Sequence, residues 1–549
     1  MALDLHKKAL SSTKYKVKPL EITEDIVNSK YYKDPLQLLG EKNFGRPRKI
    51  PKDEIGTPIQ EFFRDASVFV TGGTGFMGKI LVEKLLRAIP HLKHIYLLVR
   101  PKKGKAVQER LEAIFEDRLF LRLKTEVPHF LEKISAVAGD VSLPGLGLSE
   151  TDRELLRTNV NVIFHGAATV RFDEKIQLAV AINVLGVRAM LELAREIRQL
   201  KSFVHVSTAF AHCPRDDVSE TFYPTPYKYE SIINLVKTAD EEKLRMLTPS
   251  LLGKWPNTYT FTKALAEDAI RIEGRDLPIA VFRPAVIVST YREPVRGWID
   301  NVYGPVGLMV GIGTGVLHTY QYDQDAVTEM VPVDMVVNSV IATAWYTAKS
   351  NQQQIPIYNY VSSVQKPVTW NEFLQHNIKH GHHWPTIRAV WYYSFWPTKS
   401  RIMFLFLNFL LHTIPGLILD GVASMFGKTP MLSSVYTKLG KVASTLEYFV
   451  DRKWNWSNEN VQALWDQLSP EDQEMFFFDM GQLDWEYHAE ALCLGLRLYL
   501  VHDDLTSLPA ARRKWQKLYI AHCILRAVAV FVLFRILWFI FDVLFNIFS

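Results

Sequence analysis

The stretch Val68–Arg87, VFVTGGTGFMGKILVEKLLR, decides the fold of this chain. It begins as a short apolar strand, continues as a glycine loop, and ends with apolar residues at helical spacing. The three spaced glycines let the strand turn sharply, let the backbone approach a pyrophosphate, and let the helix pack on the sheet. We therefore expect a dinucleotide-binding loop, with a purely structural turn as the alternative. The loop residues are Thr71, Gly72, Gly73, Thr74, Gly75, Phe76, Met77 and Gly78.

Apolar strands and helical segments alternate after this loop. The clearest helical segment is AVAINVLGVRAMLELAREI at 179–197. Because each strand is nearly all apolar, we expect a parallel sheet covered on both faces, that is, an α/β, Rossmann-type doubly wound fold. The other expected strands are HIYLLVR at 94–100, KISAVAGD at 133–140, VNVIFHGAA at 160–168, SFVHVSTA at 202–209 and IAVFRPAVI at 279–287.

Composition along the chain divides it into four parts. Residues 1–60 are polar, with few periodic apolar positions, and are expected to form a loosely ordered leader. Residues 61–385 carry the alternating pattern and are expected to form the dinucleotide-binding Rossmann-type domain, with a substrate subdomain. Residues 386–510 are rich in Trp and Phe and are expected to form a mainly helical C-terminal domain, and 520–549 a hydrophobic membrane anchor.

The first long apolar run in the C-terminal part is IMFLFLNFLLHTIPGLIL at 402–419. Pro415 and Gly416 in its second half suit a turn better than a straight span. A buried helical hairpin and a membrane-dipping segment therefore both stay open.

The second apolar run, AVAVFVLFRILWFIFDVLFNIFS at 527–549, is long enough to cross a bilayer of about 30 Å. Arg535 and Asp542 interrupt it. We therefore expect either a transmembrane helix or a helix anchored in the plane of the membrane, and a buried C-terminal helix is the alternative. The basic stretch ARRKWQK at 511–517 precedes it. By the positive-inside rule, the domain that precedes this run is then expected to face the cytosol.

The overall composition excludes several classes of protein. The formal charge of +6 is small for 549 residues, and no basic stripe or aromatic RNA-binding motif occurs, so no nucleic-acid partner is expected. Cys213, Cys493 and Cys523 lie far apart, which excludes a disulfide framework and a cysteine zinc site. We expect a reducing compartment and no metal.

The residues after the second strand distinguish the two nicotinamide cofactors. A preference for NAD would place an acidic residue about 20 residues after the glycine loop, but this strand ends in Arg100, followed by Lys102 and Lys103. A guanidinium can hold a 2′-phosphate through two hydrogen bonds, so NADPH is the expected cofactor. A solvated basic cluster is the alternative. Asp140, after Gly139 at the end of the third strand, is a weaker candidate for an adenine contact.

Tyr259 and Lys263 form the candidate catalytic pair. Positions i and i+4 of a helix share a face, and we expect the ammonium to lower the pKa of the tyrosine toward the working range of an acid–base group. The spacing is common by chance, but here it follows the glycine loop and the strand at 202–209. Ser207 and Thr208 end that strand, where a hydroxyl could bind a substrate carbonyl or only cap a turn.

These motifs resemble those of the extended short-chain dehydrogenase/reductases, and more closely those of the eukaryotic alcohol-forming fatty acyl-CoA reductases. The similarity extends from about residue 60 to 505. It rests on the glycine-loop stretch and on FHGAATVRFD, FVHVSTAFAH, YTFTKALAE, FRPAVIVSTYREPVRGWIDNVYGP, VPVDMVVN and LHTIPGLILD. The strings GGTGFMGK and GWIDN are more specific than the Tyr–Lys pair.

The resemblance implies NADPH-dependent reduction of a long- or very-long-chain fatty acyl-CoA to a primary alcohol, with release of CoA, through an enzyme-bound aldehyde. It implies that Thr208 and Tyr259 bind the oxyanion, that Tyr259 donates the proton, and that Lys263 binds ribose hydroxyls. Three further residues match positions beside the cofactor or after the fourth strand: Ala167, Asn183 and Pro284.

A membrane anchor suits a substrate whose chain partitions into lipid, so we expect acyl-CoA and membrane lipid as partners. Peroxisomal and endoplasmic reticulum membranes both stay open. The apolar residues 400–420 are a candidate lining for an acyl tunnel. Two other functions stay open: an oxidoreductase acting on a sterol, another lipid carbonyl or a nucleotide sugar, and a non-catalytic membrane scaffold. Acyl chain length and oligomeric state do not follow from the sequence.

Overall fold

The computed structural model describes residues 54–101, 104, 106–350, 354–427 and 429–548. Its centre is a seven-stranded sheet in the order β11-β7-β5-β4-β1-β2-β3, with every neighbouring pair parallel. The expected doubly wound α/β fold is therefore confirmed. The strands are β1 Ser67–Thr71, β2 His94–Val99, β3 Ile134–Ala138, β4 Val162–His165, β5 Ser202–Val206, β7 Ile279–Pro284 and β11 Ile357–Tyr360.

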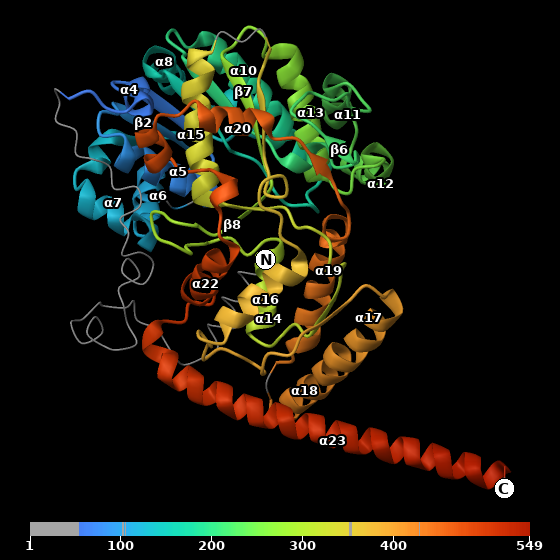
Figure 1. Ribbon diagram of the computed structural model, residues 1–549. Helices are drawn as coiled ribbons and strands as arrows, with labels where there is room; N and C mark the ends of the chain where they lie inside the picture. The colour runs from blue at the N-terminus through green and yellow to red at the C-terminus, as the bar shows by residue number, and fades with distance from the viewer. Residues whose placement is uncertain (1–53, 102–103, 105, 351–353, 428, 549) are drawn as a thin grey trace.

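Helices cover both faces of the sheet (Figure 1). On one face, Val68 and Val70 of β1 share a core with α5 (Phe76–Ala88) and α15 (Val333–Lys349). On the other, Phe69 shares a core with α10 (Gly186–Glu196) and α13 (Thr258–Glu273). Alternate residues of each strand are thus buried on opposite faces, which explains why the strands are apolar throughout.

The strand order reverses between β1 and β4. The chain builds β1, β2 and β3 toward one edge, then crosses back to add β4, β5, β7 and β11 on the other side. In sheets of this type, ligands bind outside the carboxyl ends of the strands at such a reversal. The glycine loop leaves β1 at this point.

The helices of the C-terminal part pack against the same body. Phe476 and Leu492 belong to the core that contains Val68, and β13 (Asn455–Trp456) pairs with β6 (Asp217–Val218). The region 386–510, expected as a helical domain, therefore shares a core with the sheet. Helices of this region are α19 Leu432–Val450, α20 Glu459–Asp466 and α22 Trp485–Gly495. Two helices that precede it in the sequence are α14 Pro305–Gly313 and α16 Trp370–Gly381.

The expected loose leader at 1–60 lies mostly outside the described residues. Its last part is ordered, because α4 (Pro58–Phe62) begins with a capping box between Thr57 and Gln60. Ile59 and Phe63 are fully buried, and they lie four positions apart on one helical face. This spacing explains why α4 belongs to the folded body.

The apolar run at 402–419 forms one continuous helical stretch. It consists of α17 (Arg401–Asn408), a π-helical turn at Phe409–Thr413, and α18 (Ile414–Met425). The interpretation as a buried hairpin is wrong, because most of its large apolar side chains are exposed. Pro415 does not break it, since the π-turn changes the hydrogen-bond register just before the missing N–H.

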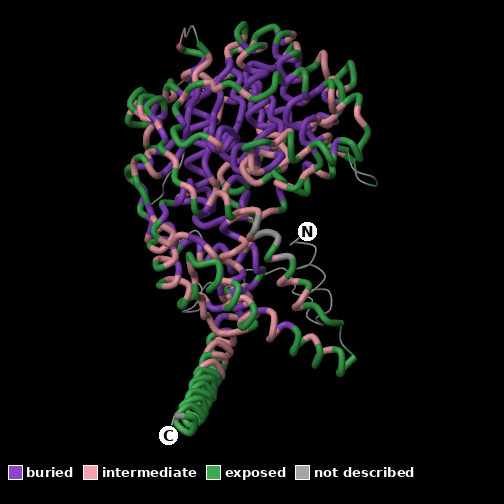
Figure 2. The backbone as a smooth tube through the Cα atoms, turned by 90° about the vertical axis from the view of Figure 1, so that its right-hand side faces the viewer, coloured by how far each residue is buried: buried purple, intermediate pink, exposed green. Residues whose placement is uncertain are grey.

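The chain ends in α23 (Leu508–Phe548), which projects from the body as a long rod (Figure 2). The most apolar part of this helix has no buried residue, so the buried C-terminal helix is excluded. Among the described residues, three helices are long and apolar enough to cross a membrane: Ile176–Glu196, Arg401–Met425 and Leu505–Ile547. The first is largely buried in the α/β body, which leaves the other two as candidates for contact with a membrane.

Candidate active site

The glycine loop forms a tight turn between β1 and α5. Gly72 has a positive φ of 76°, and the N–H of Gly75 donates to the Gly72 carbonyl at 3.0 Å. A Cβ on Gly78 would lie 2.2 Å from the Gly72 oxygen, so only glycine allows this approach of helix to strand. No side chain caps the first turn of α5. Its free N–H groups and its dipole therefore suit the pyrophosphate of a dinucleotide.

Thr71 connects the glycine loop to the loop after β4. Its hydroxyl pairs with Nδ1 of His165 at 2.7 Å and accepts a hydrogen bond from the Ala167 N–H at 3.3 Å. Ala167 and Pro284, at the end of β7, both line the cavity beside the glycine loop. The structure thus brings these expected residues together.

Asn183 lies in a helix and stabilises the loop after β4 through hydrogen bonds. It lies in a π-helical turn at Ala181–Leu185 and is buried. Its carboxamide accepts from the Thr169 N–H at 3.0 Å and donates to the Thr169 carbonyl at 3.2 Å and to the Thr262 hydroxyl at 3.0 Å. This residue positions the backbone that borders the cavity.

Arg100 lies at the exposed rim of the cavity, directly after β2. Its Nε contacts Oδ2 of Asp140 at 2.8 Å, and 59% of its side chain is exposed. Arg110 lies at the same rim and donates to the Arg100 carbonyl. Two guanidinium groups therefore gather where the sequence predicted one, while Lys102 and Lys103 fall outside the described residues.

Tyr259, Lys263 and Thr208 line the same cavity. The Tyr259 ring stacks on Phe172, with centroids 5.9 Å apart and planes 15° apart. The Lys263 ammonium donates to the Val206 carbonyl at 2.8 Å. The end of β5 and the first turns of α13 thus bring a phenol, a hydroxyl and an ammonium together beside the glycine loop.

The electrostatics of the pair differ from the expectation. Burial raises the pKa of Tyr259 to about 12, and the Thr208 hydroxyl opposes the shift. Burial also lowers the pKa of Lys263 to about 8, while Glu267 acts in the opposite direction. The prediction that Lys263 lowers the tyrosine pKa is wrong here, because its ammonium contacts Val206 and burial of the phenol dominates. Tyr259 is thereby held as a protonated phenol, the form that donates a proton.

The Ser207 hydroxyl is bound to a buried carboxylate, although the residue also lines the cavity. Its hydroxyl donates to Oε1 of Glu267 at 2.5 Å. The Glu267 carboxylate also receives Nε2 of His212 at 2.9 Å and two nitrogens of Arg283 at 2.9 and 2.6 Å. These groups are buried; burial acts to raise the pKa of Glu267, but the Arg283 guanidinium outweighs it and holds that pKa well below its usual range. Of the two neighbouring hydroxyls, it is that of Thr208 that interacts with the Tyr259 phenol.

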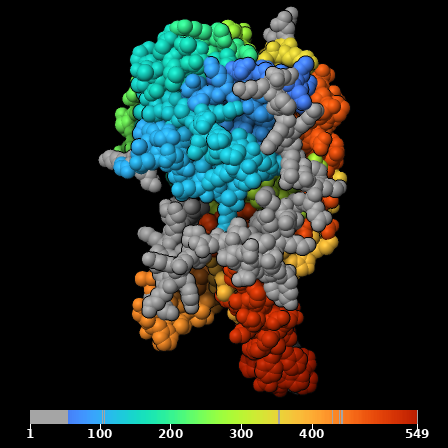
Figure 3. Space-filling model, turned by 90° about the vertical axis from the view of Figure 1, so that its left-hand side faces the viewer, coloured from blue at the N-terminus to red at the C-terminus, as the bar shows by residue number. Residues whose placement is uncertain are grey.

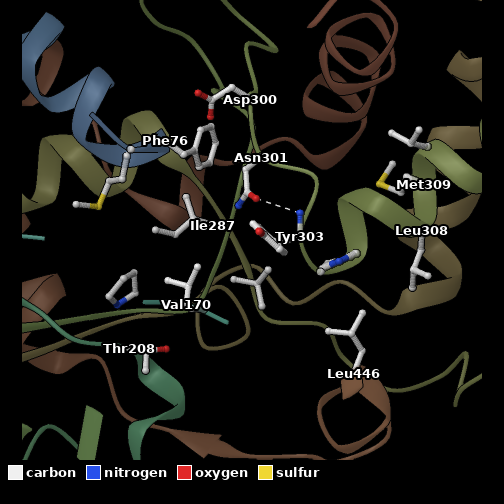
Figure 4. Close-up of a pocket in the computed structure, with 18 of the residues that line it drawn as sticks. Phe76, Val170, Thr208, Ile287, Asp300, Asn301, Tyr303, Leu308, Met309 and Leu446 are labelled. Atoms are coloured by element: carbon white, nitrogen blue, oxygen red, sulfur yellow. Dashed lines mark hydrogen bonds between the residues drawn. The ribbon is translucent and has the colours of Figure 1, made fainter. Parts of the chain in front are cut away.

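The cavity measures about 1100 Å³ and continues past the polar groups into an apolar region. Figure 4 shows Thr208 on one side of the space, Phe76 of α5 above it, and Leu308 of α14 and Leu446 of α19 on the far side. Asn301 lies between them, and its Oδ1 accepts from the Tyr303 N–H at 3.0 Å. The volume exceeds that of most single-ligand pockets, so the cavity has room for a cofactor and a second molecule.

Several lining residues were not expected as site residues from the sequence. Phe172 and Asn301 fall within motif strings that carried the family resemblance, so those strings contained a usable signal. Arg110 lies ten positions after Arg100 in α6 (Val107–Phe115) and has no such signal. It reaches the cavity only because α6 returns along β2 and β3.

The sheet, the glycine loop and the tyrosine–lysine pair together define a nicotinamide-dependent oxidoreductase of the Rossmann type. Residues 70–340 match the NAD-binding family model described as Male sterility protein, and 411–503 match a second model, Sterile, with the same description. The chain belongs to the fatty acyl-CoA reductase family, as the sequence motifs predicted.

Curated relatives establish this membership. The chain is 42% identical to fatty acyl-CoA reductase wat of Drosophila melanogaster, over 88% of this chain and 94% of the relative. It is 39% identical to fatty acyl-CoA reductase 1 of Homo sapiens, over 84% and 89%. Fatty acyl-CoA reductase 2 of Bos taurus is 36% identical over 87% and 93%.

Solved structures share the fold. The reductase domain of a nonribosomal peptide synthetase from Mycobacterium tuberculosis has a TM-score of 0.54 at 20% identity, over 83% of this chain and 97% of that chain. The terminal R domain of the myxalamid pathway has a TM-score of 0.53 at 19% identity, over 79% and 90%. At these identities, the likeness concerns the arrangement of the sheet and helices.

Proposed function

We propose that this protein reduces a long- or very-long-chain fatty acyl-CoA to a primary alcohol, with NADPH as reductant, release of CoA, and an enzyme-bound aldehyde between the two reductions. The observation that carries the proposal is one cavity of about 1100 Å³ that joins the glycine loop, Tyr259 and a long apolar region. The names of the relatives support an acyl-CoA substrate.

The residues at the polar end fit a dinucleotide phosphate. The first turn of α5 has no side-chain cap, and the close approach of Gly78 to the Gly72 carbonyl holds this turn beside the loop, where its N–H groups can receive the pyrophosphate. Arg100 and Arg110 at the rim supply the cations that a 2′-phosphate requires, which favours NADPH over NADH. When bound, this cofactor supplies hydride.

The remaining groups act on the substrate carbonyl. The hydroxyl of Thr208 and the phenol of Tyr259 bind the oxygen as negative charge develops on it. The raised pKa of Tyr259 keeps its proton available for the alcohol oxygen. Lys263, as an ammonium below its pKa of about 8, binds ribose hydroxyls. Two hydrides and two protons convert the thioester to the alcohol and free CoA thiol, so the electrons balance.

The apolar part of the cavity accepts the acyl chain. Its lining comes from α14, α16, α19 and α22 together with the first turns of α23. The segment 400–420, expected as a tunnel lining, does not border this cavity. Instead, α17 and α18 border a smaller separate cavity of about 450 Å³ with α19. The acyl chain therefore lies between helices of the body, because α17 and α18 project outward.

The protein acts at a membrane, with α23 as its anchor. The four cations in 511–517 precede the apolar part of this helix, which favours a cytosolic catalytic domain on a peroxisomal or endoplasmic reticulum membrane. The juxtaposition of an exposed apolar rod and an apolar cavity supports a lipid substrate.

Product analysis tests the proposal. The full-length protein in vesicles is incubated with NADPH and a series of saturated acyl-CoAs, and NADPH oxidation, CoA thiol, aldehyde and alcohol are measured. We expect two NADPH oxidised for each alcohol formed. No oxidation with any acyl-CoA would exclude this function, and turnover with a sterol ketone instead would favour the alternative oxidoreductase. NADPH binding without any turnover would favour the scaffold.

A further inference from the structure

The cavity extends well beyond the reacting groups. Its lining runs from the glycine loop past α14 and α16 to His382, Tyr393 and Trp515. His382 is exposed and Trp515 is half-buried, so the cavity reaches the surface beside the first turns of α23. This opening, lined by His382, Tyr393 and Trp515, is called the far opening below. It is distinct from the rim at Arg100, where the residues proposed to bind the cofactor lie.

The path to the far opening is apolar. Leu308, Phe373, Leu374 and Ile378 line it. The guanidinium of Arg497 also borders this part, but it donates to the carbonyls of Pro385 and Asp504 and to the Ser507 hydroxyl. Because its donors are engaged inside the protein, this part of the cavity suits a hydrocarbon chain rather than a phosphate.

An aromatic collar surrounds the base of α23 at the far opening. We define the collar as Trp391, Tyr392, Trp515 and Tyr519. The Tyr392 ring lies 4.9 Å from that of Trp515 and 5.0 Å from that of Tyr519. Trp391 Nε1 donates to Nδ1 of His522 at 3.2 Å. Trp and Tyr gather at the depth of lipid headgroups, where an apolar ring with a polar edge meets both phases.

The surface beyond the collar has the character of a membrane-buried surface. Basic side chains at 513 and 517 are exposed just before it. From Ile520 onward most of the side chains that α23 exposes are apolar, with Arg526, Arg535 and Asp542 between them. The stretch α17–α18 exposes apolar side chains at the same end of the molecule, as three views agree (Figures 1, 2 and 3). Two apolar helical elements therefore flank the end of the body that carries the far opening.

We propose that the far opening is a lipid-side portal, seated at headgroup depth, through which the alkyl chain passes between the cavity and the bilayer leaflet. This inference rests on the proposed function and adds a route for the chain. Each methylene favours an apolar environment over water by about fourfold. A path from cavity to leaflet that avoids water is therefore much less costly for a long chain than one through the rim at Arg100.

Blocking the portal tests the route. Gly381 lines the cavity next to His382, and its Cβ would meet only Sγ of Cys493, at 4.0 Å, so Gly381→Trp can add a large side chain there. The matched control is Gly421→Trp on exposed α18, where a Cβ meets nothing within 4 Å. We expect Gly381→Trp to lower kcat/KM for long acyl-CoAs by about sixteenfold if two methylenes are displaced. The shortest acyl-CoA that the unchanged protein reduces should be unaffected, and Gly421→Trp should change neither.

A reversible block covers the case in which Gly381→Trp does not fold. His382→Cys in a Cys523→Ser background is modified with benzyl methanethiosulfonate after the protein is shown to be active. Cys213 is buried and its pKa is raised to about 12, which keeps this thiol unreactive, whereas Cys493 is only partly buried and lines the cavity, so it is also replaced by serine in this background. Long-chain turnover should fall on modification and return with dithiothreitol. Unchanged long-chain turnover after complete modification overturns the portal.

The depth of the opening is measured separately. A fluorophore on His382→Cys is quenched by nitroxide-labelled phosphatidylcholine or by acrylamide in vesicles of phosphatidylcholine with phosphatidylserine. The control is Met246→Cys, which is 71% exposed on α12 (Glu241–Leu252). We expect lipid quenching at 382 and only acrylamide quenching at 246. Acrylamide quenching alone at 382 would overturn a lipid-side opening. An unchanged protein inactive on every acyl-CoA would instead refute the proposed function.

Discussion

The three glycines of the loop are equivalent as a motif, but the structure ranks them. A Cβ on Gly78 would lie 2.2 Å from the Gly72 oxygen, 2.5 Å from the Gly73 Cα and 2.8 Å from the Gly72 carbonyl carbon. All three are backbone atoms, so no rotamer change relieves the clash. A Cβ on Gly75 would meet only the Gly72 oxygen, at 3.2 Å. Gly72 is equally intolerant of a side chain, because it has a positive φ and its Cβ would lie 2.7 Å from the Ala167 nitrogen, so Gly78→Ala serves as a severe substitution and Gly75→Ala as its matched control.

The expected magnitudes follow from these distances. To restore ordinary contacts, α5 must move away from the loop by more than about 1 Å, and overpacking of this kind costs about 3 kcal/mol of unfolding free energy. The first-turn N–H groups of α5 move with the helix, so NADPH affinity should also fall, by about tenfold or more. For Gly75→Ala we expect about 1 kcal/mol, because alanine is a poorer N-cap than glycine.

Urea unfolding followed by circular dichroism measures the first effect, and NADPH fluorescence titration the second. The reasoning is refuted if Gly78→Ala is no less stable than Gly75→Ala. Equal NADPH affinity for Gly78→Ala and the unchanged protein would also refute the assigned role of the loop.

Four further predictions concern the cofactor and the reaction. Arg100→Ala should weaken NADPH binding by about tenfold and leave NADH binding unchanged. Equal losses of affinity for the two cofactors, measured by titration, would argue against a 2′-phosphate contact. Tyr259→Phe should lower alcohol formation by a factor of about 100 or more while NADPH still binds; retained turnover in product assays would contradict the assigned acid. NADPH affinity should fall as pH rises through about 8, since the ammonium of Lys263 is lost there; a flat affinity across that range would contradict ribose binding by the ammonium. Asn183→Leu should cost about 2 to 4 kcal/mol in urea unfolding, because it leaves the buried partners at Thr169 and Thr262 unsatisfied; a loss below about 1 kcal/mol would show that the π-turn does not depend on them.

Local patterns predicted most of the sheet. Six of its strands have nearly unbroken apolar runs, and the glycine loop marks the turn after the first of them. The apolar runs and the glycine spacing are therefore enough to predict these six strands. The strand β11 was missed because IYNY has only four residues and includes a polar Asn359, whose side chain bonds to Val218 and Ser457 carbonyls from distant parts of the chain. Its place in the sheet depends on partners that no local window contains.

The sequence by itself determined the doubly wound fold, the dinucleotide loop and the tyrosine–lysine spacing, because each depends on residues within one or two turns of each other. Only the tertiary structure decided between Ser207 and Thr208. Both residues line the cavity, but the Ser207 hydroxyl is bound to Glu267, 60 positions away, and it is Thr208 that interacts with Tyr259. It also decided the raised pKa of Tyr259 and the course of the cavity toward α23, since burial and enclosure depend on how distant segments pack.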